Sequence, residues 1–435
     1  MSAPPLRVAL AGLGTVGVGL LRLLAANGQR VAGRAGRAVQ VTHVAARDRS
    51  RDRGVPLDAC VWWDDPVAMA RDAEADVVVE LIGGSDGAAL ATVRAALAAG
   101  RPVVTANKAL LAHHGMDLAS AAEAAGVALA YEGAVAGGIP VVKALRESLA
   151  GNRINRVVAI LNGTSNYILT HMRQSGRDFA EVLADAQRLG YAEADPAFDV
   201  DGVDAAHKLA LLASLAFGSR VDFPAIHVEG IRHITPLDHA YAAELGYRIK
   251  LLGIARRERG AIEQRVHPCL VSLDEPIAHI EGVLNSVLLD GDPVGPVELE
   301  GRGAGAGPTA SAVAGDLVDI ARGNAGPAFG LPVADLAALP TLAMAQREGA
   351  VYIRLMVRDQ PGVIAEVATI LRDARVSLEA LVQRARAPDS TVPVVMTTHS
   401  APEGAVRQAL DRIARLDAVV APPAAIRIEN LSPDA

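Results

Sequence analysis

The sequence predicts an α/β protein of three parts: a doubly wound parallel sheet, an α+β middle domain and a small C-terminal βαββαβ unit. Three observations predict this order. Short apolar runs alternate with helical patterns over the first part of the chain, mixed patterns follow, and a segment rich in Gly, Pro and Ala precedes the last unit. The chain has 435 residues, a length at which about three domains are expected.

The first part carries four short apolar runs, at residues 6–11, 39–45, 76–82 and 102–105. Helical patterns at 87–99 and 110–125 lie between or after them. This alternation of two-residue and 3.6-residue periods predicts parallel strands joined by crossover helices.

A glycine motif connects the first strand to the first helix. Gly12, Gly14 and Gly17 follow the run 6–11 and open a helical pattern. The first glycine permits a tight turn, the second lets backbone approach a pyrophosphate, and the third lets the helix pack closely. The motif predicts a Rossmann-type domain, with a dinucleotide against Gly12, Leu13, Gly14, Thr15, Val16 and Gly17.

The end of the second strand indicates which dinucleotide binds. The first polar residue there is Arg47, which suits the 2′-phosphate of NADP(H). Asp48 follows and leaves NAD(H) open, because an acidic residue at this place accepts the ribose 2′-hydroxyl.

The rest of the chain divides by composition. We expect a Rossmann domain over 1–135, completed by about 305–340, and a substrate-binding and dimerisation domain over 136–304. Residues 305–345 form a return segment that includes a linker at 323–340, and 346–435 form the last unit, whose predicted strands are 351–357, 376–383, 391–399 and 418–429.

Composition excludes several classes of protein. The formal net charge is −7 and the pI about 5.9, which argues against nucleic acid or an anionic membrane as the main partner. Cys60 and Cys269 fit no ligand spacing, and no apolar run has the length of a membrane helix. We expect a soluble cytoplasmic protein.

The stretch 192–213 is dense in carboxylates and then turns apolar. Asp204 and Lys208 are four residues apart, so they share one face of a helix. A lysine where a polar loop meets a buried helix is a candidate catalytic acid. The alternative is an ordinary helix start with an i,i+4 ion pair.

Three other motifs leave two interpretations each. Lys108, in T-A-N-K, ends a parallel strand, where it either reaches a ligand or is a solvated loop lysine. The glycine-rich segment 131–140 is either a cation-binding turn or a hinge. In L-N-G-T-S-N-Y, Thr164 or Ser165 either caps the next helix or faces a carboxylate substrate. The eleven histidines show no metal-ligand spacing.

Taken together, the motifs resemble those of homoserine dehydrogenases. The resemblance rests on G-L-G-T-V-G, V-V-E-L-I-G-G, T-A-N-K, Y-E-G-A-V-A-G-G-I-P, L-N-G-T-S-N-Y and A-E-A-D-P-x-x-D-V-x-G-x-D-A-A-H-K-L, in that order. The last unit resembles an ACT domain through its βαββαβ order and D-Q-P-G-V.

This resemblance implies the reversible NAD(P)-dependent interconversion of L-aspartate 4-semialdehyde and L-homoserine. It implies that Lys208 donates a proton and that Lys108 lies at the nicotinamide and substrate. It implies that Glu193 binds the substrate amino group, while Asp199 and Asp204 hold substrate and lysine in place. Thr164 and Ser165 are expected at the substrate carboxylate.

The resemblance also implies sites away from the reacting atoms. A monovalent cation, usually sodium, is expected at Glu132, Val135, Gly137 and Ile139, and the chain is expected to return to the cofactor at Gly315. A homodimer or homotetramer is expected, with an amino-acid effector such as L-threonine at the ACT domain.

Two other classes of protein compete with this assignment. An aspartate-semialdehyde dehydrogenase needs a nucleophilic cysteine, and neither Cys60 nor Cys269 lies in a suitable motif. A non-catalytic sensor of nucleotides and amino acids would not need both lysines and the carboxylate cluster.

Overall fold

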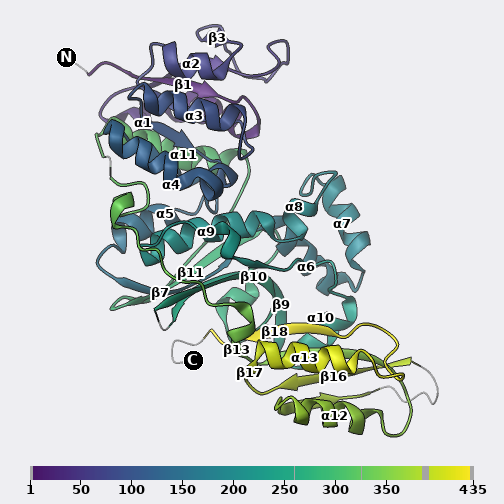
Figure 1. Cartoon of the computed structure of the whole chain (residues 1–435). Helices are drawn as coiled ribbons and strands as arrows, with labels where there is room; N and C mark the ends of the chain where they lie inside the picture. Colours follow the sequence, from purple (N-terminus) through teal and green to yellow (C-terminus); the bar gives the residue numbers. More distant parts are fainter. Residues whose placement is uncertain (1–2, 259, 325, 385–390, 432–435) are drawn as a thin grey trace.

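The computed structural model describes residues 3–258, 260–324, 326–384 and 391–431 (Figure 1). A parallel-sheet domain containing the N-terminus lies at one end of the molecule and the βαββαβ unit at the other. A mixed α/β layer separates the two. Within the described ranges, no helix is long and apolar enough to cross a membrane.

The N-terminal domain is a six-stranded parallel sheet in the order β3-β2-β1-β4-β5-β6. Its strands are β1 Leu6–Ala11, β2 Val39–Ala45, β3 Val61–Trp63, β4 Val77–Glu80, β5 Val103–Thr105 and β6 Leu129–Ala130. Its helices are α1 Thr15–Ala35, α2 Pro66–Asp72, α3 Ala88–Ala98 and α4 Lys108–Ala125. The predicted doubly wound sheet is confirmed. The sequence missed β3 and β6, which are too short to show a two-residue period.

In the middle domain, helices pack on a sheet that contains strands β7, β9, β10, β11 and β12 (Figure 1). The strands, with the two-residue β8, are β7 Arg153–Ile160, β8 His227–Val228, β9 Tyr247–Glu258, β10 Ala261–Ser272, β11 Leu284–Asp292 and β12 Gly295–Arg302. The helices are α5 Val141–Lys143, α6 Gly163–Ser175, α7 Phe179–Arg188, α8 Ala197–Val200, α9 Val203–Phe217 and α10 Pro236–Glu244. The central helix α9 is buried over most of its length, as its long apolar run requires.

The chain then returns to the first domain. Helix α11, Ala306–Ala321, packs against α1, and its residues Ala310, Val313 and Leu317 join the core under β1 and β4. Part of the segment predicted as a linker packs against the first domain. Phe329 is 1% exposed, with its ring centroid 5.5 Å from that of Tyr131.

The C-terminal unit has the predicted βαββαβ order. Its elements are β14 Val351–Arg358, α12 Val363–Asp373, β15 Leu378–Val382, β16 Thr391–Thr398, α13 Glu403–Ile413 and β18 Ala424–Glu429. Two-residue strands, β13 Glu348–Gly349 and β17 Ala401–Pro402, pair beside it. Part of one predicted strand-to-strand connection, 385–390, lies outside the described residues.

The C-terminal unit does not keep a sheet of its own, although the sequence predicts a separate unit after a linker. Strand β18 pairs in parallel with β10 of the middle domain, with Cys269 opposite Arg427. The result is one sheet in the order β12-β11-β7-β9-β10-β18-β14-β16-β15. Because β18 would otherwise be an edge strand, the pairing satisfies backbone groups that would be left open.

Buried ion pairs line this junction. Arg265 on β10 is 2% exposed and donates from Nη1 and Nη2 to the two oxygens of Glu429 on β18, at 2.7 and 2.9 Å. Arg347 adds a 2.7 Å bond to Glu429. We call the whole group the ion-pair seam; its members are Glu229, Glu263, Arg265, Arg347, Glu403, Arg427 and Glu429.

Arg265→Met tests how much the ion-pair seam contributes to stability. The change leaves Glu263 and Glu429 buried with one cation fewer, so we expect the free energy of unfolding to fall by about 3–5 kcal/mol. Denaturant unfolding followed by circular dichroism measures it. Arg71→Ala, which breaks an exposed pair with Asp72, should leave the free energy of unfolding almost unchanged, because water screens exposed ion pairs. Equal losses in the two variants would contradict a stabilising role for the seam.

Candidate active site

The glycine loop has the geometry that a pyrophosphate requires. Gly12 has φ +101°, and a Cβ there would lie 2.4 Å from the carbonyl oxygen of Leu81. At Gly17 a Cβ would lie 2.1 Å from the oxygen of Gly12. Open space surrounds Gly14, where a Cβ would have no neighbouring atom within 4 Å. Helix α1 starts at Thr15 without a side-chain cap, so its first N–H groups can meet an anion.

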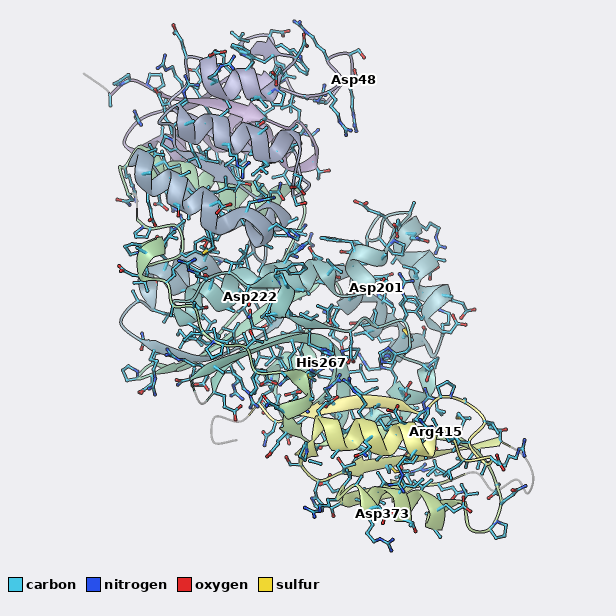
Figure 2. The ribbon with its side chains drawn as sticks, in the orientation of Figure 1. Asp48, Asp201, Asp222, His267, Asp373 and Arg415 are labelled. Carbon is cyan, nitrogen blue, oxygen red and sulfur yellow. The ribbon has the colours of Figure 1, made fainter. Side chains whose placement is uncertain are left out.

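Arginines gather at the rim of this loop. Arg47 is exposed directly after β2, on the projecting loop that carries Asp48 in Figure 2. Arg53 reaches back to the glycine loop, with Nε donating to the carbonyl of Leu13 at 3.3 Å. The prediction from the sequence named Arg47 and missed Arg53. The arginine-rich run at 47–53 was the signal that could have found it.

A buried glutamate organises the edge of the sheet next to this loop. Glu80 is 0% exposed and accepts from Thr105 Oγ1 at 2.6 Å and from the backbone N–H of Ile82 at 2.7 Å. Thr105 Oγ1 in turn accepts from the backbone of Asn107, whose side chain caps α4 at Leu110. Glu80 was not among the predicted site residues, although V-V-E-L-I-G-G contains it.

Two lysines from different domains meet at one carboxylate. Lys108 is the first residue of α4, and its Nζ lies 3.2 Å from Asp204 Oδ1. Lys208 Nζ lies 2.7 Å from Asp204 Oδ2, one turn along α9, and donates to the carbonyl of Leu161 at 2.7 Å. Asn162 Nδ2 adds a third bond to Asp204, at 2.8 Å. The predicted shared helix face of Asp204 and Lys208 is confirmed.

The two carboxylates of this cluster have opposite electrostatics. Burial raises the pKa of Asp204, but the charges of Lys208 and Lys108 outweigh it and hold the pKa well below the usual range. Burial, and then the negative charge of Asp204, raise the pKa of Asp199. Asn162 donates to both. Asp204 is therefore held in its ionised form. The raised pKa of Asp199 would fall if a further cation came close to it.

The junction before α6 is capped differently from the prediction. Neither Thr164 nor Ser165 is the N-cap; Asn162 is, accepting from the backbone N–H of Ser165 at 2.7 Å. Asparagine suits this position because its amide oxygen caps the helix while its Nδ2 donates to the carboxylates of Asp199 and Asp204. Ser165 Oγ donates to the carbonyl of Asp199 at 3.0 Å, and Thr164 Oγ1 to that of Tyr191 at 2.7 Å.

Glu193 is a surface residue. Its side chain is exposed on the loop between α7 and α8, and its backbone oxygen accepts from Gln187 at 3.0 Å. Among the described residues, no ion pair joins Glu193 to the cluster around Asp204.

A cavity opens where the two domains face each other. It measures about 350 Å³ and is lined by Gly84 from the β4 loop, Lys108 from α4 and His207 from α9. Phe198 of α8 also lines it, with its ring centroid 5.6 Å from Lys108 Nζ. The cavity lies at the carboxyl ends of β4 and β5, where open parallel sheets bind ligands. His207 is neutral there, since burial lowers its pKa to about 4.

The predicted cation loop has strained backbone. Ala136 and Gly137 have successive positive φ angles, +53° and +49°. For a non-glycine residue such as Ala136 this conformation costs about 1–3 kcal/mol and is typical of functional sites. Val135 and Ile139 on either side are buried, at 0% and 2% exposed.

The carboxylate of Glu132 is already committed to the backbone. It accepts from the N–H groups of Val142 at 3.0 Å and Lys143 at 2.8 Å, while its own N–H donates to Asp316 at 2.9 Å. Burial, and then Glu132, raise the pKa of Asp316 to about 7. Gly315 lies near Lys143, whose backbone binds Glu132: a Cβ on Gly315 would lie 3.5 Å from Lys143 Nζ.

One cluster elsewhere has metal-ligand residue types. His267, Cys269 and Glu429 offer atoms within 4.8 Å of one another, and His267 lies at the boundary of the C-terminal unit in Figure 2. Burial raises the pKa of the Cys269 thiol, and burial with the Arg265 charge lowers the pKa of His267. Because Arg265 and Arg347 already bind Glu429, this place disfavours a cation.

Comparison with known proteins assigns this site to a family. The family model for homoserine dehydrogenase matches residues 140–318, and that for the homoserine dehydrogenase NAD-binding domain matches 12–132. The homoserine dehydrogenase of Pseudomonas aeruginosa is 46% identical over 438 residues, which cover 98% of this chain and 100% of that protein. The chain belongs to the homoserine dehydrogenase family. It is an NAD(P)-dependent oxidoreductase that acts on a CH–OH group and interconverts L-aspartate 4-semialdehyde and L-homoserine.

Solved homoserine dehydrogenases agree with the fold. The enzyme of Thiobacillus denitrificans has a TM-score of 0.93 and 44% identity, covering 99% of this chain and 100% of that one. A hyperthermophilic archaeal homoserine dehydrogenase in complex with NADPH has a TM-score of 0.64 and 25% identity, covering 74% and 99%. The ACT domain model matches residues 351–418, so the predicted ACT domain is confirmed.

Gly17→Ala and Gly14→Ala separate packing from ligand binding in this loop. The methyl at Gly17 meets backbone, so we expect about 1–3 kcal/mol of destabilisation, seen as a lower melting temperature. The methyl at Gly14 meets open space, so stability should stay within about 0.5 kcal/mol while the stabilisation given by NADPH falls. Thermal melting with and without NADPH measures both. A Gly14 variant stabilised normally by NADPH would contradict the open space being the pyrophosphate site.

Proposed function

We propose that Lys208 is the proton donor of the homoserine dehydrogenase reaction and that Lys108 stabilises the reacting oxygen. The observation that carries this is the single Asp204 carboxylate shared by both lysines. A reduced nicotinamide held at the glycine loop would supply hydride to the aldehyde carbon. The two lysine ammonium groups would stabilise the negative charge that grows on the aldehyde oxygen. Lys208 Nζ gives that oxygen a proton, and the aldehyde becomes the CH₂OH of homoserine.

We propose that the ends of the substrate are held on the other side of Asp204. Asp199 is half-buried, and a nearby cation would stabilise its ionised carboxylate. Asp199 and Glu193 together therefore suit the substrate ammonium group. Glu193 is exposed on the α7–α8 loop, so its carboxylate is open to a ligand. The backbone N–H of Thr164, in the first turn of α6, then serves the carboxylate, since the N–H of Ser165 donates to Asn162 and both hydroxyls donate to carbonyls.

We propose a preference for NADP(H) over NAD(H). Arg47 is exposed at the end of β2, and Arg53 lies against Leu13 of the glycine loop. Two guanidinium groups suit a 2′-phosphate, whereas Asp48 is engaged locally with Ser50, at 2.6 Å. The archaeal relative in complex with NADPH supports this preference.

We propose that the loop carrying Glu132, Val135, Gly137 and Ile139 holds a sodium ion. The residues fit such an ion through backbone oxygens, because the left-handed pair at 136–137 redirects successive peptides and the Glu132 carboxylate is occupied by N–H groups. Sodium accepts carbonyl oxygens as a hard cation. Gly315 and Asp316 bring α11 to the same loop, which links the cation site to the cofactor domain.

We propose an amino-acid effector such as L-threonine at the ACT domain, and a homodimer or homotetramer. The D-Q-P-G-V turn before α12 and the pairing of β18 with β10 support regulation, because a change in the ACT domain reaches the middle domain through one sheet. We also propose domain limits of 1–135, 136–304, 305–345 and 346–435.

Lys208→Ala should lower kcat by roughly 10²–10⁴, the usual contribution of a positioned acid. A spectrophotometric assay with L-homoserine and NADP measures it. Lys250→Ala is the matched control, since Lys250 is equally buried, 3% against 7% exposed, but bonds Asn166 instead of the cluster. Near-normal turnover in the Lys208 variant would reject its role.

Arg47→Ala should raise KM for NADP by about tenfold, as expected for one lost charged contact, and leave KM for NAD unchanged. Arg51→Ala in the same loop serves as the control. Steady-state kinetics with each cofactor decide. An equal rise with NAD would mean that Arg47 does not bind the 2′-phosphate.

A further inference from the structure

A short segment connects the active-site loop to the ACT domain. We call residues 228–232, Val228 to Arg232, the strap; it begins at the last residue of β8 and passes beside α8. The backbone N–H of Ile231 donates to the carbonyl of Val200 at 2.9 Å. Arg232 pairs with Asp201, with Nη2 3.1 Å from Oδ2. Val200 directly follows Asp199, so one end of the strap lies against the residue proposed to hold the substrate.

The fit between strap and loop is close enough to transmit a displacement. A Cβ on Gly230 would lie 2.4 Å from the oxygen of Val200 and 2.6 Å from the Cα of Asp201. Backbone therefore touches backbone here, with no flexible side chain between. Because packed protein interiors are poorly compressible, a shift of the strap must move the loop.

The other end of the strap is held by the ACT domain. Arg427 on β18 donates from Nη1 and Nη2 to the two oxygens of Glu229, at 2.7 and 2.8 Å. A bidentate guanidinium–carboxylate pair fixes orientation as well as distance. Arg427 is 6% exposed and also bonds Glu403 of α13 at 2.6 Å. The backbone N–H of Glu229 donates to Val266 of β10 at 2.7 Å.

These contacts form a continuous path of four steps. It runs from Arg427 to Glu229, along the backbone to Ile231, across to Val200 and on to Asp199. Each step is a hydrogen bond or a run of covalent neighbours. On this path, the Glu229 side chain is what joins the strap to the ACT domain, through its two bonds with Arg427.

We propose that Glu229 is a positioning residue for substrate binding: held by Arg427, it fixes the strap and thereby the place of Asp199. The ACT domain then acts on the affinity for homoserine through this link, without touching substrate or cofactor. The inference rests on the substrate role proposed for Asp199.

Glu229→Gln in the full-length enzyme tests it. The variant keeps size and one acceptor oxygen but loses the charge that Arg427 binds. We expect KM for homoserine to rise roughly 2- to 30-fold, the range of coupling changes along such networks, with KM for NADP unchanged and kcat less affected. A residue that merely stabilised the fold would not separate the two KM values.

Gly230→Ala tests the loop end of the strap without touching an ion pair. Its methyl displaces Val200 and Asp201, so the same selective rise in KM for homoserine is expected. Asp238→Asn is the matched control. Asp238 also pairs with an ACT arginine, Arg354, at 2.7 Å, but on α10, so KM for homoserine should not change.

The outcomes separate the inference from the proposed function. Unchanged KM for homoserine in Glu229→Gln or in Gly230→Ala overturns the inference, as does an equal rise in Asp238→Asn. Asp199→Asn tests the substrate role alone. If it leaves KM for homoserine unchanged, the role of Asp199 fails, whatever the strap variants do.

Discussion

The way in which the cofactor and substrate domains face each other is tied to one buried carboxylate, Asp204. Asp204 is 4% exposed and receives three hydrogen-bonding or charged partners, from α4, α9 and the loop before α6. A buried carboxylate with fewer partners would cost several kcal/mol. Because Lys108 comes from the cofactor domain and Lys208 from the substrate domain, satisfying Asp204 also fixes how the two domains face each other. The chemistry and the domain arrangement thus rest on the same contacts.

The ion-pair seam plays a comparable part at the other end of the substrate domain. Buried pairs gain little over apolar packing, because desolvation offsets their attraction. Their directionality is what apolar contacts lack: Arg265 meets Glu429, and Arg427 meets Glu229, through two bonds each. The parallel pairing of β18 with β10 has three residue pairs. The seam adds its bidentate bonds at the same junction, so a change of register there would break them.

The features that could be predicted from the sequence are those that a local pattern of residues determines. Strand and helix periods indicated the parallel sheet, the glycine spacing indicated the cofactor loop, and the four-residue step from Asp204 to Lys208 indicated their pairing. The meeting of Lys108 with Asp204 is a contact between distant segments, so no periodicity reports it. The capping of α6 by Asn162 was missed because Thr164 and Ser165 are equally good caps by residue type, and the carboxylates that need the Asn162 amide come from elsewhere. Glu80 and Glu229 belong to the same class of long-range contacts.

Charge balance explains why two carboxylates stand side by side in this site. Lys108, Lys208 and Asp204 together carry a net positive charge, which the substrate carboxylate and the developing alkoxide would compensate. Burial and the charge of Asp204 raise the pKa of Asp199, and a cation close to Asp199 would lower that pKa again. In the proposed arrangement that cation is the substrate ammonium group, so the charges of Asp199 and of the bound substrate stabilise each other.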